Sequence, residues 1–398
     1  MLHNPKVSVV IPSYNHARFL SSAIDSALAQ TYRDFEILIA DDGSSDDSLT
    51  IANDYAASYP SVVRVFTHAD NRHRGISATC NLCLRNMRGV YWAGLASDDV
   101  WYPDKLERQV AFLDENPEVG FVYGYAHIID EAGELLPGVR DEEDISLQPD
   151  PLARLIWGNV ISGGTCLIRR ECWERLGLYD ETLVYSDWEL WVRFLSHWKV
   201  GYLAEPFAKY RHHHYNTSVG SPLEVQLERA VDVLSALLRK ASVIGGTLAR
   251  PRTQALLNLQ LAHFHFLLGE TKKAAECFRA AFKSDSSLSN DAAYITNWLD
   301  VIDANTDLRI LTFENLPLKA RRAFGRRSLG SQYLRAAQAY YWAKDLPKAG
   351  KMAFRYLVND PFGSDTKTGL YILGERILGS RLMRRARRWR PHAAGNAP

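Results

Sequence analysis

The sequence from residue 7 to residue 15 reads Val7-Ser8-Val9-Val10-Ile11-Pro12-Ser13-Tyr14-Asn15. Its first part is a short apolar run that ends at Pro12, as expected for a buried strand. A helical pattern follows over residues 17–30, a second strand over 36–40 and a helix from about residue 46. Strands over 62–67 and 91–95 then flank a helix over 76–87. This strand-helix-strand order predicts an α/β sheet with mainly parallel strands.

Two acidic pairs follow predicted strands, Asp41-Asp42 after the second and Asp98-Asp99 after the fourth. Ligands of such sheets bind at the carboxyl ends of the strands. Adjacent carboxylates are costly to hold together without a positive charge beside them. Their hard oxygens suit Mg²⁺ or Mn²⁺, which commonly also binds substrate phosphates. The pairs therefore predict a site for a divalent cation and a diphosphate.

Three motifs, in this order and spacing, resemble those of the inverting glycosyltransferases of family 2, which have the GT-A fold. They are residues 7–15, residues 30–46 with Asp41-Asp42-Gly43-Ser44, and residues 97–106 with Ser97-Asp98-Asp99. The resemblance covers about residues 5–215. It implies an enzyme of surface polysaccharide or glycoconjugate synthesis. Such an enzyme moves a sugar from a nucleoside-diphosphate sugar, with a UDP-sugar favoured, to a glycan or lipid-linked acceptor.

The resemblance also assigns roles to individual residues. The nucleotide is expected to contact Pro12, Tyr14, Asp42, Arg74 and Asp98. Mn²⁺ or Mg²⁺ is expected at Asp99, together with either His212 or His214. Three consecutive histidines on an extended strand cannot all face one site, because alternate side chains point apart. On the diphosphate and acceptor side we expect Arg211, Gly163, Gly164 and Thr165.

Asp187 is the expected catalytic base, because it matches the second acid of the family's acidic pair before an aromatic-rich helix. The same residue is well placed to cap that helix, in which case N–H groups would lower its pKa. The chain departs from the family pattern at Ser186 and at Ala96, where many members carry acids. These losses leave open a catalytically degenerate domain that acts as a scaffold. A sugar-phosphate nucleotidyltransferase is disfavoured, since no glycine-rich phosphate loop follows the first strand.

The second half of the chain has a different character. Residues 1–220 hold 19 basic and 31 acidic side chains, whereas the rest holds 28 basic and 15 acidic. Helical patterns cover residues 223–248, 254–268, 272–283, 333–343 and 347–358. The spacing from Ala262 to Ala281 resembles a tetratricopeptide hairpin, with a weaker copy from Ala337 to Pro361, but a plain bundle fits as well. We expect a catalytic domain over residues 1–221, a helical domain over 222–360 that binds a protein partner, and a tail over 361–398.

The tail carries six arginines between residues 381 and 390. This composition fits contact with an anionic membrane surface, and it fits a solvated basic tail as well, whereas nothing else in the chain indicates nucleic-acid binding. No apolar run reaches the roughly 20 residues of a spanning helix, and the start lacks a signal-peptide pattern. Five scattered cysteines predict buried thiols without disulfides. We therefore expect a cytoplasmic protein with peripheral contact at the inner membrane face.

Overall fold

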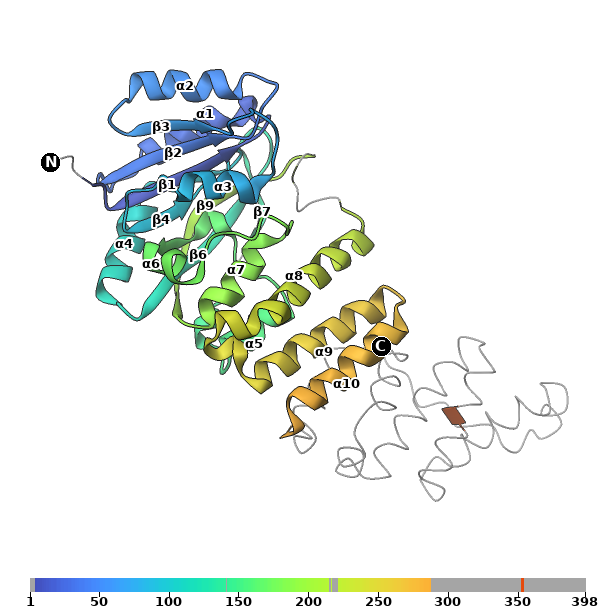
Figure 1. The fold of residues 1–398 in the computed structure, drawn as a ribbon. Coiled ribbons are helices and arrows are strands. Elements are labelled where there is room, and N and C mark those ends of the chain that lie inside the picture. The colour runs from blue at the N-terminus through green and yellow to red at the C-terminus, as the bar shows by residue number, and fades with distance from the viewer. Residues whose placement is uncertain (1–3, 141, 215, 217–220, 288–351, 354–398) are drawn as a thin grey trace, which may run out of the picture. The chain divides into compact units, whose positions relative to one another are not determined.

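The computed structural model describes residues 4–140, 142–214, 216, 221–287 and 352–353 of the chain (Figure 1). The chain divides into two compact units, and the first ends at Thr253. The two units are described separately. The arginine-rich tail lies outside the described residues, and so does the weaker repeat copy apart from Met352 and Ala353.

The first unit is built around one nine-stranded sheet with helices packed on it (Figure 1). In spatial order its main path consists of β3 (Val63–Thr67), β2 (Phe35–Asp41), β1 (Val7–Ser13), β4 (Tyr91–Gly94), β8 (Leu167–Arg169), β6 (Val119–Ile129), β9 (Lys199–Arg211) and β5 (Val100–Trp101), while β7 (Leu135–Arg140) pairs with β6.

The helices of this unit are α1 (Ala17–Leu28), α2 (Ser48–Ser58), α3 (Ile76–Leu84), α4 (Lys105–Glu115), α5 (Pro151–Trp157), α6 (Arg170–Leu176), α7 (Ser186–Leu195) and α8 (Leu223–Ile244). Short 3₁₀ turns occur at Ile145–Leu147, Gly163–Thr165 and Gly246–Ala249. The order of strands and helices confirms the α/β prediction, and the first four expected strands all form.

The parallel strands β3, β2, β1 and β4 form one half of the sheet. Val9, Ile11, Ile37 and Ile39 are fully buried in it. Helices cover both faces of such a sheet, and its strands therefore read as continuous apolar runs. This is why the sequence predicted these strands so closely.

The other half of the sheet is mixed, but β1 to β4, β6 and β9 all run in the same direction, so the expectation of mainly parallel strands is confirmed. β8 runs antiparallel to β4 and to β6, whereas β6 and β9 are parallel. β6 contains Gly120 and Gly124, although glycine is unfavourable inside a strand and often marks a bend or a close approach of another chain segment. A Cβ added to Gly120 would lie 2.6 Å from the Cβ of Trp198, and one added to Gly124 would lie 2.6 Å from the Glu205 oxygen. These glycines permit close packing inside a strand, and they hide that strand from the sequence pattern.

Helix α8 belongs with the first unit, although the sequence placed the domain boundary before it. It packs against α7 and buries Leu234 and Leu237 completely. Lys240 Nζ lies 2.5 Å from Asp180 Oδ2 and 3.4 Å from Glu189 Oε1, which lies on α7. The first compact unit therefore ends at Thr253, whereas the sequence interpretation ended its first domain at residue 221.

The second unit includes most of α9 (Pro251–Leu267) and all of α10 (Thr271–Ser284), joined by a turn in which Gly269 has a φ of 76°. Ala262, Ala274, Phe278 and Ala281 are buried, as the predicted helical hairpin requires. The tetratricopeptide class itself stays a prediction. Within the described part of the chain, no helix has the length and apolarity to cross a bilayer. The five cysteines form no disulfide, and four of them are buried.

Candidate active site

The candidate site lies at the carboxyl ends of the central strands. The loop after β1 carries Tyr14, Asn15 and His16, and β2 ends at Asp41. Asp98 and Asp99 follow β4. The segment after β9 returns to the same edge, because the backbone N–H of Arg211 donates to Asp99 Oδ1 over 2.8 Å. The fold thus brings the three sequence motifs together with the histidine segment.

The loop after β1 is held by the start of α2. Asn15 has a φ of 52°, in the left-handed region, and its side-chain oxygen accepts a hydrogen bond from Ser45 N over 2.7 Å. The backbone N–H of His16 donates to Ser48 Oγ over 3.0 Å. An Asn tolerates this backbone shape because its short polar side chain bonds locally. These contacts fix the direction in which the His16 side chain leaves the loop.

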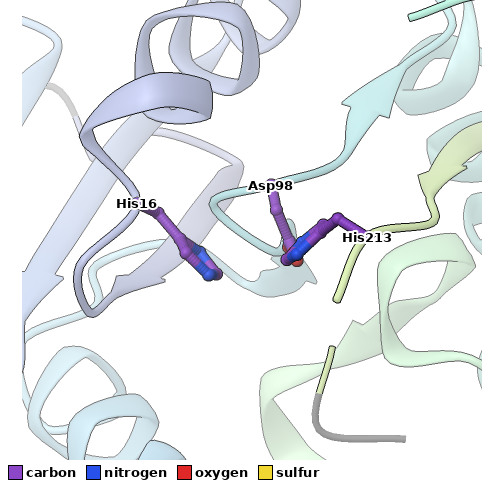
Figure 2. Close-up of side chains that lie close together, drawn as sticks. All are labelled: His16, Asp98 and His213. Atoms are coloured by element: carbon purple, nitrogen blue, oxygen red, sulfur yellow. The ribbon is translucent and has the colours of Figure 1, made fainter. Parts of the chain in front are cut away.

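His16, Asp98 and His213 form a cluster at this edge, and Figure 2 shows Asp98 and His213 side by side with the His16 ring opposite them. One ligand atom from each lies within 4.8 Å of the others. His213 Nε2 is 2.9 Å from Asp98 Oδ2, and His16 Nδ1 is 2.7 Å from Ser97 Oγ. Burial lowers the pKa of His16, which favours its neutral, metal-binding form.

The structure distinguishes the three consecutive histidines by their burial. The sequence favoured His212 or His214, but both are exposed, and His213 is the buried one that contacts Asp98. The strand ends at Arg211, and Asn216 Oδ1 accepts the backbone N–H of His213 over 2.6 Å. Strand alternation therefore stops short of the three histidines, and the following turn decides which one faces inward.

The two acids of the pair have different surroundings in the structure. Asp99 was the expected metal ligand, but its Oδ1 accepts the Arg211 N–H, and it lies outside the histidine cluster. Asp98, expected near the ribose, provides the carboxylate of that cluster. Burial and the neighbouring Asp98 raise the pKa of Asp99 well above its ordinary value. Asp99 thus joins the turn to β9, while Asp98 faces the cluster.

Arg211 braces the same turn through backbone carbonyls. Its Nε donates to the Asp98 carbonyl oxygen over 2.8 Å, and its Nη1 donates to the carbonyl oxygens of Asp130 and Glu131 over 3.1 Å each. Several backbone carbonyls therefore hold a side chain that the sequence assigned to phosphate. The guanidinium fixes the backbone from which Asp98 projects.

The expected nucleotide side also forms a connected group. Asp42 is nearly inaccessible, and its carboxylate accepts the backbone N–H groups of Arg74 and Gly75 over 2.8 and 2.9 Å. The Arg74 side chain pairs with Asp70 at 3.0 Å. Tyr14 is exposed beside it, whereas Pro12 is half-buried within β1. Arg74 thus contacts Asp42 through its backbone, and its guanidinium is directed elsewhere.

Asp187 lies in the first turn of α7 and is not its cap, because the helix begins at Ser186 and Tyr185 occupies the N-cap position. Its Oδ1 accepts the N–H of Trp188 over 2.7 Å, and its Oδ2 accepts Asn159 Nδ2 over 3.1 Å. Burial nevertheless raises its pKa above the ordinary value, contrary to the expectation for a cap. Ser186, at the family's acidic position, is buried and forms a 2.7 Å hydrogen bond with Ser77.

The turn over residues 163–165 lies close to Asp99 of the acidic pair and to helix α7, which carries Asp187. A Cβ added to Gly163 would lie 4.0 Å from Trp191 of α7, and one added to Gly164 would lie 3.7 Å from Asp99 Oδ2. Thr165 is buried. The glycines thus allow the turn to approach both the acidic pair and the helix that carries Asp187.

Three side chains that follow the acidic pair hold the backbone of this turn. Trp101 Nε1 donates to the Gly164 oxygen over 2.8 Å, Gln109 Nε2 to the Thr165 oxygen over 2.7 Å, and Lys105 Nζ to the Cys166 oxygen over 3.0 Å. Lys105 is fully buried, which lowers its pKa to about 7. Trp101 and Trp188 are buried as well, as expected for core residues that border a site.

The sequence interpretation missed several residues of this site, namely His16, Asn159, His213, Lys105 and Gln109. Two of them carried a readable signal: His16 directly follows the quoted Tyr14-Asn15, and His213 stands two residues after Arg211. The other three carried none, because their importance depends on carbonyl and carboxylate partners that are distant in sequence.

The fold and site define a glycosyltransferase with the GT-A fold. Residues 8–177 match the description Glycosyl transferase family 2. The chain is 34% identical over 249 residues to the uncharacterized glycosyltransferase RP339 of Rickettsia prowazekii, covering 60% of this chain and 73% of that protein. It is 35% identical over 248 residues to the uncharacterized glycosyltransferase RT0329 of Rickettsia typhi, covering 60% and 73%. The chain belongs to glycosyltransferase family 2.

A solved structure shares the fold. The crystal structure of S. aureus TarS, residues 1–349 in complex with UDP-GlcNAc, aligns with a TM-score of 0.51 at 17% identity and covers 89% of this chain and 92% of that one. The match supports the mixed sheet described above.

Proposed function

We propose that this enzyme transfers a sugar from a nucleoside-diphosphate sugar to an acceptor hydroxyl with inversion, using Asp187 as the base and a divalent cation at Asp98 and His213. The observation that carries the proposal is the cluster of His16, Asp98 and His213 at the carboxyl ends of the central strands. Bound nucleotides in open α/β sheets occupy this edge.

The residues of the cluster fit a cation. Two imidazoles and one carboxylate converge with their ligand atoms within 4.8 Å, and the carboxylate and His213 are buried. Mg²⁺ prefers all-oxygen ligands, whereas imidazole suits softer divalent ions. This donor set therefore favours Mn²⁺ over Mg²⁺. A bound cation would offset the charge of the donor diphosphate.

The nucleotide side of the proposal rests on Tyr14 and Asp42. An exposed aromatic ring offers a stacking face to a base, and a carboxylate accepts a ring N–H. A uracil base has such an N–H, so a UDP-sugar is the donor that we propose to test first. Asp42 is fixed by the N–H groups of Arg74 and Gly75 and is thereby held in one orientation.

Asp187 would accept the proton of the acceptor hydroxyl as that oxygen attacks the anomeric carbon. An inverting transfer is one in-line displacement and needs a single base. The raised pKa strengthens the carboxylate as a base compared with an ordinary aspartate. The hydrogen bonds from Asn159 and Trp188 N fix its orientation.

The acceptor side is proposed to be the turn of Gly163, Gly164 and Thr165. It lies between Trp191 of α7 and Asp99, and it has no bulky side chain at its two glycines. We propose a glycan or a lipid-linked acceptor for this side. The arginine-rich segment 381–390 would hold the enzyme on an anionic membrane. A chain ending at Ser380 should then lose binding to phosphatidylglycerol vesicles, and unchanged binding would remove this part of the proposal.

The test is a donor screen. Thermal shift with Mn²⁺ and a set of nucleotide sugars identifies the donor, and a coupled assay of nucleoside-diphosphate release then measures turnover. Asp187→Asn should lower kcat by about 10²- to 10⁴-fold, a range typical for the loss of a general base, and should leave donor affinity unchanged. A variant with full kcat would show that Asp187 is not the base.

A further inference from the structure

His73 lies on the surface that the proposed function assigns to the donor base. Its ring centroid is 4.1 Å from that of Tyr14, with the two planes tilted by 33°. Its Nδ1 is 2.9 Å from Asp42 Oδ2. The imidazole thus occupies both places that a base would take, against the Tyr14 ring and beside the Asp42 carboxylate.

A base cannot reach Asp42 while His73 stays in place. The Asp42 side chain is only 3% exposed. Its Oδ1 accepts Arg74 N and lies 3.3 Å from His68 Nε2, and its Oδ2 accepts Gly75 N. His68 is itself buried and lies 3.2 Å from Thr79 Oγ1. Of the two histidines at this carboxylate, only His73 is exposed to solvent on its outer side, with 53% of its side chain accessible.

The backbone of the loop that carries His73 is packed in place. Asp42 can therefore become accessible only if the His73 side chain rotates. Gly43 has a φ of 76°, and a Cβ added to it would lie 2.8 Å from the Asn71 oxygen and 3.0 Å from His73 N. The loop backbone therefore packs directly on Gly43. An exposed side chain rotates at little cost, whereas this packed backbone does not move freely. Rotation of the imidazole alone would open both contacts.

We propose that His73 is an internal competitor of the donor base and speeds release of the nucleoside-diphosphate product. The proposal rests on the proposed function, because it concerns the same nucleotide site. When the imidazole returns to Tyr14 and Asp42, it replaces the base contacts and lowers the affinity for the product. Only the fraction of molecules in which His73 has moved away can bind the base. The apparent Kd therefore equals the intrinsic Kd divided by that fraction.

Titration calorimetry of the full-length protein with UDP and with GDP, in the presence of Mn²⁺, tests this inference. His73→Ala should lower the Kd of whichever nucleotide binds by about tenfold, the effect of losing one competing polar contact with a charged group. His73→Phe keeps a ring on Tyr14 but loses the polar contact with Asp42, so its effect should be smaller. In steady-state assays, His73→Ala should lower KM and kcat together, since product release becomes slower.

Arg72→Ala is the matched control, because it changes an exposed side chain of the same loop and neither of the two contacts. It should leave the Kd within about twofold at a salt concentration that screens distant charges. An unchanged or higher Kd for His73→Ala would overturn the inference and leave the proposed function standing. If neither the wild type nor His73→Ala binds UDP or GDP, the proposed function and this inference both fail.

Discussion

The pKa of Asp187 shows how burial and hydrogen bonding compete at one carboxylate. Burial disfavours the charged form and raises the pKa, whereas Trp188 N and Asn159 stabilise the charged form and lower it. Burial is the larger effect. A base must be ionised to accept a proton, so transfer should slow as the pH falls through this raised pKa.

Asn159→Ala tests this balance. It removes the Nδ2 donor at 3.1 Å from Asp187 Oδ2, so the pKa should rise further and the acid limb of the pH–rate profile should move to higher pH. The measurement is kcat/KM against pH for the variant and the wild type. An acid limb that stays in place or moves to lower pH would show that Asp187 does not limit the rate.

The different contacts of two adjacent acidic residues could not be predicted from the sequence. The motif identified Asp98 and Asp99 as a pair, and both are indeed at the site. Their contacts differ because the backbone N–H of Arg211 donates a hydrogen bond to Asp99. Arg211 is more than one hundred residues away in the chain. The turn stabilised by Asn216 likewise selects His213 from three consecutive histidines.

At the scale of elements, the sequence predicted the parts with a clear period and missed the others. Strands β1 to β4 and helices α1, α3, α7 and α8 follow from apolar runs and helical spacing. Strands β6 and β9 carry glycines and register shifts, because they bend and pack closely against other elements. Half of the sheet, including the strand that leads to His213, was therefore not predicted.

Helix α4 contributes a buried amine whose protonation should affect stability. The pKa of Lys105 is about 7, compared with 10.5 when unburied. At a pH between 7 and 10.5, Lys105 is protonated in the unfolded chain and neutral in the folded chain. The free energy of unfolding should therefore rise with pH across this range. The slope for one proton is about 1.4 kcal/mol per pH unit at most.

Denaturant unfolding of Lys105→Met and the wild type at pH 6, 7.5 and 9 measures this effect. Relative to Lys105→Met, the wild type should become more stable as the pH rises. Lys199→Met is the matched control, since Lys199 is largely exposed, and it should show no such trend. A pH-independent difference between the wild type and Lys105→Met would mean that the buried amine keeps its ordinary pKa.

At the scale of the whole molecule, the acidic half of the chain contains the complete candidate site. All of the residues assigned to donor, cation and base lie before residue 217, within the first compact unit. Many of the basic residues in the second half lie beyond the described residues. The neutral total charge thus combines an acidic catalytic unit with a basic remainder.

Two shortened chains test where the catalytic unit ends. A chain ending at Arg250 retains α8 and should unfold cooperatively and bind the donor nucleotide as the full chain does. A chain ending at Ser221 loses the buried residues Leu234 and Leu237 and the contacts of Lys240 with Asp180 and Glu189. It should be much less stable in thermal unfolding. Equal stability of the two chains would place the boundary where the sequence did.

The central claim is that Asp98, together with His16 and His213, holds a cation that the sugar transfer requires. It is tested most directly by the Mn²⁺ dependence of nucleoside-diphosphate release from the donor identified in the screen. The wild type should lose activity in EDTA and recover it with Mn²⁺. Asp98→Asn should stay inactive at all Mn²⁺ concentrations, and Asp47→Asn, which alters an exposed carboxylate on the neighbouring helix, should behave as the wild type. Metal-independent turnover, or full activity of Asp98→Asn, would contradict the account, and absence of turnover with every donor would favour a degenerate scaffold.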